Sequence, residues 1–297
     1  KKLGVESKTV YAPGMMTGSY AQLRGFLYCL CAGAFSELCN ASRIVITECG
    51  STMYQPRFGP LDSVTHTTHP LILATAKKVI SVIRGKPVKF ITPFEDMTKA
   101  EIIAFSEHNN FLPETHSCIS SRFRNHCGWC YGCVIRRLGA ILADVPDVSY
   151  SKDIIQGSNV DDDNIISLIR FSYYFIFRRG ELGEYSLDRI KTYGKQDLYE
   201  RQSWDILAAM CVLKQQNFRF SPRVAKAYHE YVERAPRHKL EERVKIVRSG
   251  TKKPDFTKEI LDRLNGKIHL IKGNHEYSAL RIPERFEWIK DYHELYV

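Results

Sequence analysis

The chain has 297 residues, 44% of them hydrophobic and 26% charged, and 43 basic against 33 acidic residues give a formal net charge of +10. No apolar run reaches the ~20 residues of a membrane span and no signal peptide is recognisable, which excludes a membrane-spanning protein and predicts a cytoplasmic one. The composition is that of a globular protein. The basic charge suits an anionic partner such as a nucleotide, a nucleic acid or an acidic protein, and equally a plain solvated surface.

Residues 20–110 alternate between helical and strand patterns. In the helical segments apolar residues recur at three- and four-residue steps, and the strand segments are short β-branched runs that suit buried parallel strands. This alternation predicts half of an open α/β parallel sheet, whose ligands bind outside the carboxyl ends of the strands. The expected elements are helices 20–40, 70–84 and 98–108, strands 43–47 and 87–92, and a long loop, 52–68.

The pattern changes after residue 147. Amphipathic helices without a recognisable motif are expected at 165–178, 195–215 and 222–248, followed by a short α/β segment. The predicted units are therefore an α/β domain 1–147, an α-helical region 148–250 and a last segment 251–297.

Four of the nine cysteines fall in the window 115–137, with the spacing C-x8-C-x2-C-x2-C. A C-x2-C step lets two thiolates surround one ion, and four thiolates at tetrahedral spacing suit zinc in a structural site. The predicted zinc ligands are Cys118, Cys127, Cys130 and Cys133.

Other interpretations of this cluster stay open. A redox C-x2-C pair or an iron–sulfur cluster would use the same thiols, and His116 or His126 can replace one cysteine as ligand. The remaining cysteines lie in apolar or helical surroundings and are predicted to be reduced, as in a cytoplasmic protein. They are Cys29, Cys31, Cys39, Cys49 and Cys211.

The cysteine window resembles the zinc motif of 7-cyano-7-deazaguanine synthases (QueC). Pro93 and the run Thr98-Lys99-Ala100-Glu101-Ile102-Ile103 are similar to that family's segment between the last strand and the next helix. The stretches 22–30 and 46–70 are similar to QueC-like proteins of bacterial antiphage operons, the QatC type among them. The resemblance covers about 20–145, and more loosely the helical region to about 245.

This resemblance implies the adenine-nucleotide α-hydrolase fold, a Rossmann-like parallel sheet, of the PP-loop ATP pyrophosphatases. It implies that a carboxylate of a deazapurine-like substrate attacks the α-phosphate of ATP, that pyrophosphate leaves, and that a nitrogen nucleophile takes the acyl group. ATP and Mg²⁺ would be cofactors beside structural zinc, and cationic side chains would surround the phosphates. Expected partners are a protein or nucleic-acid target and other subunits of a defence operon.

Six residues are candidates for that chemistry. They come from the first helix, the end of the first strand, the loop 52–68 with the histidine that follows it, and the segments around the cysteines. Three of them also have ordinary interpretations: Arg24 as helix surface, Lys99 as an exposed first-turn residue and Arg136 as a charge packed on the cysteine cluster. The candidates are Arg24, Glu48, His66, His69, Lys99 and Arg136.

The family's phosphate loop, Ser-Gly-Gly-x-Asp-Ser, does not occur in the 297 residues; the nearest run, 49–52, lacks its pattern. We expect this loop and its strand to lie upstream of Lys1, the alternative being that ATP chemistry is lost. Two rival functions stay open: 7-cyano-7-deazaguanine synthesis in queuosine biosynthesis, and a non-catalytic, zinc-stabilised binding subunit of a defence complex.

Residues 264–276 resemble the Gly-Asn-His-Asp/Glu block of calcineurin-like metallophosphoesterases, which implies a metal-ligand role for Asn274 and phosphate chemistry for His275. The family's other ligand blocks are not visible, and one block cannot hold two metals. The stretch is part of an interrupted phosphoesterase domain, a fragment in a fusion, or a chance turn, and a metallophosphoesterase is the third functional hypothesis.

Overall fold

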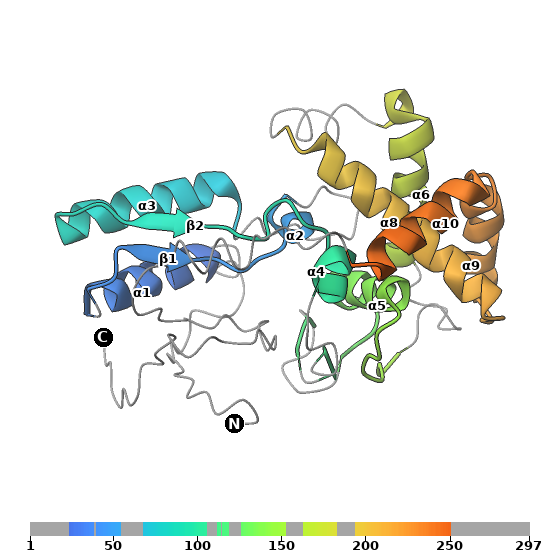
Figure 1. Ribbon diagram of the computed structural model, residues 1–297, viewed down its shortest axis with the longest axis horizontal. Coiled ribbons are helices and arrows are strands. Elements are labelled where there is room, and N and C mark those ends of the chain that lie inside the picture. The colour runs from blue at the N-terminus through green and yellow to red at the C-terminus, as the bar shows by residue number, and fades with distance from the viewer. Residues whose placement is uncertain are drawn as a thin grey trace.

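The computed structural model describes residues 24–38, 40–54, 68–105, 112–113, 115–118, 126–152, 163–182 and 194–250. In Figure 1 a small sheet with its helices lies at one end of the molecule and a group of helices at the other, with α2 and α4 between them. Among the residues described, no helix is both long and apolar enough to cross a bilayer.

The sheet has two parallel strands, with Arg43 opposite Lys89 and Val45 opposite Ile91. Two long helices pack against each other and on the strands, and their contact is close: a Cβ on Gly33 would lie 2.6 Å from Ile80 Cγ1. The alternation of helices and strands is as predicted, although both strands are shorter than expected. The elements are α1 (Arg24–Leu38), β1 (Arg43–Val45), α2 (Gly50–Met53), α3 (Pro70–Arg84) and β2 (Lys89–Ile91).

Local sequence signals explain where two of these helices begin and end. In α3 the His69 side chain caps the first turn, Pro70 occupies the first position, and Gly85 ends the helix at φ 64°. Helix α4 (Lys99–Phe105) begins at a capping box: Thr98 N donates to Glu101 Oε2 at 2.9 Å, and Glu101 N donates to Thr98 Oγ1 at 3.2 Å. The start predicted for the helix 98–108 is confirmed.

The helical group is built around α8, which contacts α5, α6 and α10. Its residues 206–210 are all buried, which requires neighbours on every side of the helix. The helices are α5 (Tyr131–Ala143), α6 (Asp163–Phe177), α8 (Gln196–Gln215), α9 (Pro222–Ala227) and α10 (Arg237–Arg248), with a 3-10 turn at Arg179–Glu181 and a π-helical turn at Tyr228–Val232.

Three predictions about where helices and loops begin and end need correction. The single helix expected over 222–248 is broken, because Pro236 cannot donate a backbone hydrogen bond and precedes the first turn of α10. The sequence predicts a helix over 134–143, after the cysteine cluster, but this helix begins at Tyr131, inside the cluster. The helical turn α2 (Gly50–Met53) includes residues 52 and 53, which were expected to belong to the loop 52–68.

The hydrophobic cores join the two ends of the molecule. One core combines residues of α4 and α5 with residues of α6, α8 and α10. The other places Phe175 of α6 and Leu198 of α8 against the residues that cover the sheet. Core contacts therefore cross residue 147, and the division into three units remains a prediction.

Candidate functional site

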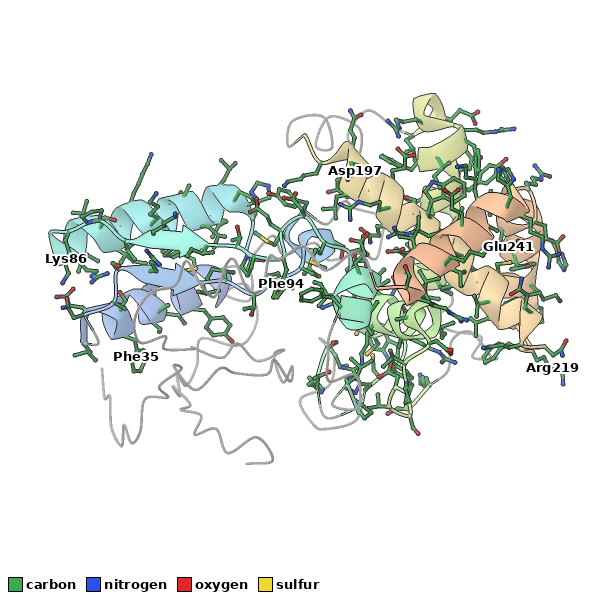
Figure 2. The ribbon with its side chains drawn as sticks, in the orientation of Figure 1. Phe35, Lys86, Phe94, Asp197, Arg219 and Glu241 are labelled. Atoms are coloured by element: carbon green, nitrogen blue, oxygen red, sulfur yellow. The ribbon has the colours of Figure 1, made fainter. Side chains whose placement is uncertain are left out.

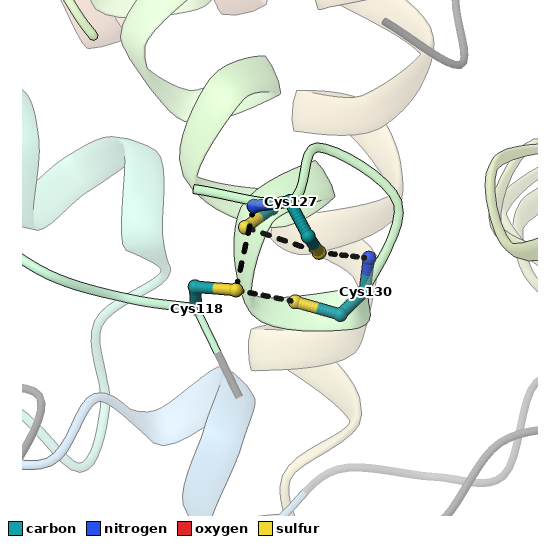
Figure 3. Close-up of side chains that lie close together, drawn as sticks. Cys118, Cys127 and Cys130 are labelled. Atoms are coloured by element: carbon teal, nitrogen blue, oxygen red, sulfur yellow. Dashed lines mark hydrogen bonds between the residues drawn. The ribbon is translucent and has the colours of Figure 1, made fainter. Parts of the chain in front are cut away.

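The four predicted cysteine ligands come together, and their Sγ atoms all lie within 4.8 Å of one another. Figure 3 shows three of them, Cys118, Cys127 and Cys130, pointing toward one another at the start of α5. The Sγ–Sγ distances are 3.9 Å for Cys127–Cys133 and 4.0 Å for Cys118–Cys130. Four sulfurs at 2.3 Å from a tetrahedral zinc ion would be about 3.8 Å apart, so the geometry suits that ion.

The backbone of the cluster explains how 16 residues can surround one point. Gly128 has φ 88°, and a Cβ there would lie 1.8 Å from the Lys152 carbonyl oxygen. Cys130 is the N-cap of α5, which places Cys133 in the first helical turn. Two backbone amides donate to sulfur, Cys127 N to Cys118 Sγ at 3.4 Å and Cys130 N to Cys127 Sγ at 3.3 Å, which favours thiolates.

Without a cation the surroundings oppose the ionisation of two of these thiols, Cys127 and Cys133. Burial raises the pKa of Cys127 to about 11. The hydrogen bond with Cys130, followed by burial, raises the pKa of Cys133 well above its ordinary value. A divalent ion supplies the missing positive charge, so these residues fit a metal ion such as zinc.

The two neighbouring histidines make contacts of their own. His126 Nε2 accepts from Ser117 N at 3.1 Å, and His116 Nε2 lies 3.1 Å from the Cys118 carbonyl oxygen. Their ring centroids are 4.7 Å apart. Over the described ranges, the residues that converge on one point are the four cysteines, with neither histidine replacing one.

Arg136 lies on α5 beside the cluster, with a side chain that is 1% exposed. Its Nε and Nη2 bind Asp147 at 2.8 and 2.7 Å, Nη1 donates to both oxygens of Thr115, and Nη2 also donates to the Leu112 carbonyl. All five N–H donors of the guanidinium are thereby used. Arg136 thus ties the chain before the cluster to the chain after it.

The carboxyl ends of β1 and β2 meet at one edge, as expected for parallel strands. Gly50 N lies 2.9 Å from Phe94 O and 3.1 Å from Met97 O, which joins α2 to the loop after β2. A Cβ on Gly50 would lie 2.1 Å from the Glu95 carbonyl oxygen, so only glycine allows this approach. We call these two joined segments, residues 48–54 and 92–98, the sheet edge.

Side chains with catalytic potential lie at the sheet edge. Glu48 is half-buried, and its Oε1 accepts from Cys49 N at 3.3 Å. The Cys49 thiol is buried, 3.1 Å from Thr52 Oγ1 and 3.5 Å from Ser51 Oγ. The first residue of α5 also reaches this edge, because Tyr131 Oη donates to Ser51 O at 3.3 Å.

The residues that α8 brings to the sheet edge were not predicted from the sequence. Lys195 pairs with Asp96 and lies 3.7 Å from Glu95, with its Nζ 4.9 Å from the centre of the Tyr54 ring. Arg201 Nη2 donates to Asp96 O at 2.7 Å. These residues belong to the part of the chain in which no motif was recognised, and a lysine before an amphipathic helix carries no signal of its own.

A buried network of charges connects the sheet edge to the helical group. Arg243 on α10 binds Glu101 Oε1 and Asp205 Oδ1, both at 2.7 Å, and Arg201 binds Glu101 from the other side. We call Glu101, Arg201, Asp205 and Arg243 the α4 network. An open groove of about 620 Å³ lies over it, with Trp204 and Ile246 among its walls.

The α4 network shifts the pKa values of its two acids in opposite directions. Burial tends to raise the pKa of Glu101, but the charges of Arg201 and Arg243 outweigh burial and hold this pKa below its usual value. Burial raises the pKa of Asp205 to about 6, and the single guanidinium of Arg243 only partly opposes this.

The other predicted site residues are placed as follows. Lys99 is half-buried and begins α4 directly after the sheet edge. His69 is buried, its Nδ1 accepts from Leu71 N at 3.2 Å, and its ring centre lies 6.1 Å from that of Tyr54. Arg24 is the first residue of α1, and its side chain lies outside the described part. His66, Asn274 and His275 also lie outside the described residues.

Comparisons with known proteins point to one family for part of the chain. Residues 15–143 match the family model described as queuosine biosynthesis protein QueC. The chain is 41% identical over 68 residues to 7-cyano-7-deazaguanine synthase of Acetivibrio thermocellus, covering 23% of this chain and 30% of the relative. The corresponding enzyme of Rhizobium johnstonii is 40% identical over 67 residues, covering 22% and 28%. The chain thus spans less than a third of the length of these curated relatives, and no solved structure matches it.

Proposed function

We propose that this protein takes part in ATP-dependent activation of a carboxylate on a deazapurine or related substrate. Its residues 15–143 match the QueC family model. The carboxylate oxygen bonds to the α-phosphorus of ATP and pyrophosphate leaves. A nitrogen nucleophile then displaces AMP from the acyl carbon. The protein would be a C–N ligase of the PP-loop ATP pyrophosphatase type.

The observation that carries this proposal is the position of the cysteine cluster inside the QueC-like segment. All four cysteines fall within residues 15–143, and α5, which begins among them, reaches the sheet edge through Tyr131. In parallel α/β sheets ligands bind beyond the carboxyl ends of the strands. The cluster thus holds a helix end beside the edge where a nucleotide would bind.

Zinc would be held by Cys118, Cys127, Cys130 and Cys133, and it would supply fold stability because four protein ligands fill its coordination sphere. ATP and Mg²⁺ are proposed from the family alone. The described sheet edge contains no glycine-rich phosphate loop, and its Lys195 already pairs with Asp96 and Glu95. We therefore assign no step involving ATP to a particular side chain.

The proposed roles of individual residues follow from where they lie. Glu48 and Lys99 are proposed to face the nucleotide and substrate at the sheet edge, with His69 supporting them from the first turn of α3. Arg24 and His66 keep the roles implied by the resemblance. The contacts of Arg136 support a structural role instead of phosphate binding, because its donors are already used.

We also propose that the substrate or acceptor is divergent and belongs to bacterial antiphage defence, with a protein or nucleic acid as acceptor. This rests on the similarity of residues 22–30 and 46–70 to QatC-type proteins. The rival is 7-cyano-7-deazaguanine synthesis with ammonia as the nucleophile, the activity named for both curated relatives.

Pyrophosphate release from ATP, measured with a panel of 7-deazapurine carboxylic acids, tests the proposal. We expect release that depends on Mg²⁺ and on the acid, and a loss of at least about tenfold in Lys99→Met. Lys77→Met, an exposed lysine on the outer face of α3, is the matched control and should retain full activity. Acid-independent release, or equal activity in both variants, would contradict the proposed site.

A non-catalytic binding subunit is the second candidate. It is favoured by the engaged donors of Arg136 and the paired state of Lys195. It predicts no pyrophosphate release by the full-length protein with any acid. The metallophosphoesterase hypothesis stays a prediction: metal-dependent phosphodiester hydrolysis that Asn274→Ala or His275→Ala abolishes.

A further inference from the structure

A continuous series of aromatic rings and cations leads from the cysteine cluster to the corner between α8 and α9. The Arg137 guanidinium lies 5.5 Å from the ring centre of Tyr150 and 5.6 Å from that of Phe218. The Phe218 and Phe220 rings are 5.9 Å apart, with Arg219 between them in the chain. We call this surface the Phe218 strip: Arg137, Tyr150, Lys214, Phe218, Arg219 and Phe220.

The strip continues onto the end of α8 and is accessible. Phe220 packs 5.3 Å from the ring of Tyr228, and Lys214 Nζ lies 5.9 Å from the same ring. Lys214 and Arg219 are exposed, and Phe218 and Phe220 are half-buried. Figure 2 shows Arg219 at the end of the helical group farthest from the sheet.

The surrounding segment is strongly basic. Residues 214–248 contain ten lysines and arginines but four acidic residues, a formal charge of +6, although Arg223, Arg243 and Arg248 pair with acids outside the segment. Within the described part of the chain, Lys214 and Arg219 form no ion pair. Their charges are therefore available to an anionic partner.

We propose that the Phe218 strip binds single-stranded nucleic acid. Unpaired bases present flat faces that stack on aromatic side chains, and the phosphates between them are attracted by lysine and arginine. A duplex hides its base faces, so the rings of Phe218 and Phe220 would add little to duplex binding. An acidic protein would use the cations but would gain no stacking from the rings.

This surface is distinct from the sheet edge. Lys195 reaches the sheet edge from the start of α8, whereas Lys214 lies near its other end, and 19 residues of helix separate them by about 28 Å. Binding at the strip is therefore measurable without ATP or a carboxylate, and it can succeed or fail independently of the proposed reaction.

The test is fluorescence anisotropy of a labelled oligothymidylate with the full chain at low salt. We expect saturable binding that weakens as salt rises. Lys214→Glu/Arg219→Glu should weaken it at least about tenfold. Phe218→Leu/Phe220→Leu, which keeps apolar bulk and removes the rings, should weaken it about fivefold or more, with the protein still fully folded at the assay temperature although its melting temperature falls slightly. Lys77→Glu/Lys78→Glu, two exposed lysines of α3, is the control and should bind like the parent protein.

Three outcomes would overturn the proposal. The first is no binding, or a loss in the control as large as in the strip variants. The second is equal affinity for a duplex together with unchanged binding by the leucine variant, which would indicate general attraction to polyanions. The third is polyglutamate competing as well as the oligonucleotide, which would indicate an acidic protein as partner.

Discussion

Two buried clusters of polar residues stabilise this molecule, and they differ in how far apart their members lie in the sequence. The cysteine cluster gathers four residues from positions 118–133, whereas the α4 network joins Glu101 to Arg243, 142 positions later. Both hold a helix end next to the sheet edge, α5 in one case and α4 in the other. A short-range cluster can be recognised from spacing, but a long-range one becomes visible only when the helices are packed.

The largest effect is expected at the cysteine cluster. Cys130→Ser removes one of four ligands, so the bound metal and the fold energy it supplies should both be lost. We expect a destabilisation of at least about 4 kcal/mol in urea unfolding and a drop from about one zinc per chain by elemental analysis. Cys31→Ser, at a half-buried cysteine outside the cluster, is the control and should keep its metal.

The next effect concerns the α4 network. Arg243→Leu leaves Glu101 and Asp205 buried without their shared cation, and breaking a buried ion pair from one side costs about 3–5 kcal/mol. Arg237→Leu is the control, because its pair with Glu241 is exposed and contributes less than about 1 kcal/mol. Equal urea midpoints for the two variants would show that the network does not fasten α10 to α4.

The acid dependence of stability sharpens the same comparison. Because the folded pKa of Glu101 is lowered, its contribution is complete above its unfolded value of about 4.5 and is lost as the pH falls through the folded pKa. For Asp205 the folded pKa is raised to about 6, so its contribution is complete below its unfolded value of about 3.8 and is lost as the pH rises through about 6. Unfolding free energies measured from pH 7 to pH 3 should therefore fall less steeply at the acid end in Glu101→Gln than in the parent protein. Parallel curves would contradict the lowered pKa.

The smallest effect is expected at Lys195, which links α8 to the sheet edge through the largely exposed Asp96. Lys195→Met should cost only about 1 kcal/mol, because solvent weakens such a pair. It should also speed amide hydrogen exchange in residues 92–98. Lys226→Met, exposed on α9, should leave that exchange unchanged. Unaltered exchange in Lys195→Met would mean that Lys195 does not hold this loop, which would leave the Arg201 contact with Asp96 O as its link to α8.

The features that could be predicted from the sequence are those written into neighbouring residues. The C-x2-C steps placed the cysteine cluster, and the predicted helices 98–108 and 70–84 begin or end at local signals, Thr98 with Glu101 in α4 and Pro70 with Gly85 in α3. Each depends on backbone geometry within one or two turns. The alternation of β1 and β2 with helices was likewise visible in the short apolar runs, but the strands are less buried than predicted, because only Ile44 of their six residues is buried.

The features that could not be predicted depend on distant partners. For Arg136 the sequence left open both phosphate binding and packing on the cysteine cluster, and the partners that support packing, Thr115, Leu112 and Asp147, could not be predicted from it. Arg243 lies in a helix with many exposed charges, so nothing in the local pattern marks it as buried. The same limit hid Lys195, whose role depends on how α8 packs against the sheet edge.

The most direct test of the proposed chemistry follows one oxygen atom. If the full-length protein activates a carboxylate by adenylation, a 7-deazapurine carboxylic acid labelled with ¹⁸O must pass one labelled oxygen to AMP when the nitrogen nucleophile displaces it. We predict labelled AMP and unlabelled pyrophosphate by mass spectrometry. Unlabelled AMP, or ADP with labelled phosphate, would contradict carboxylate adenylation.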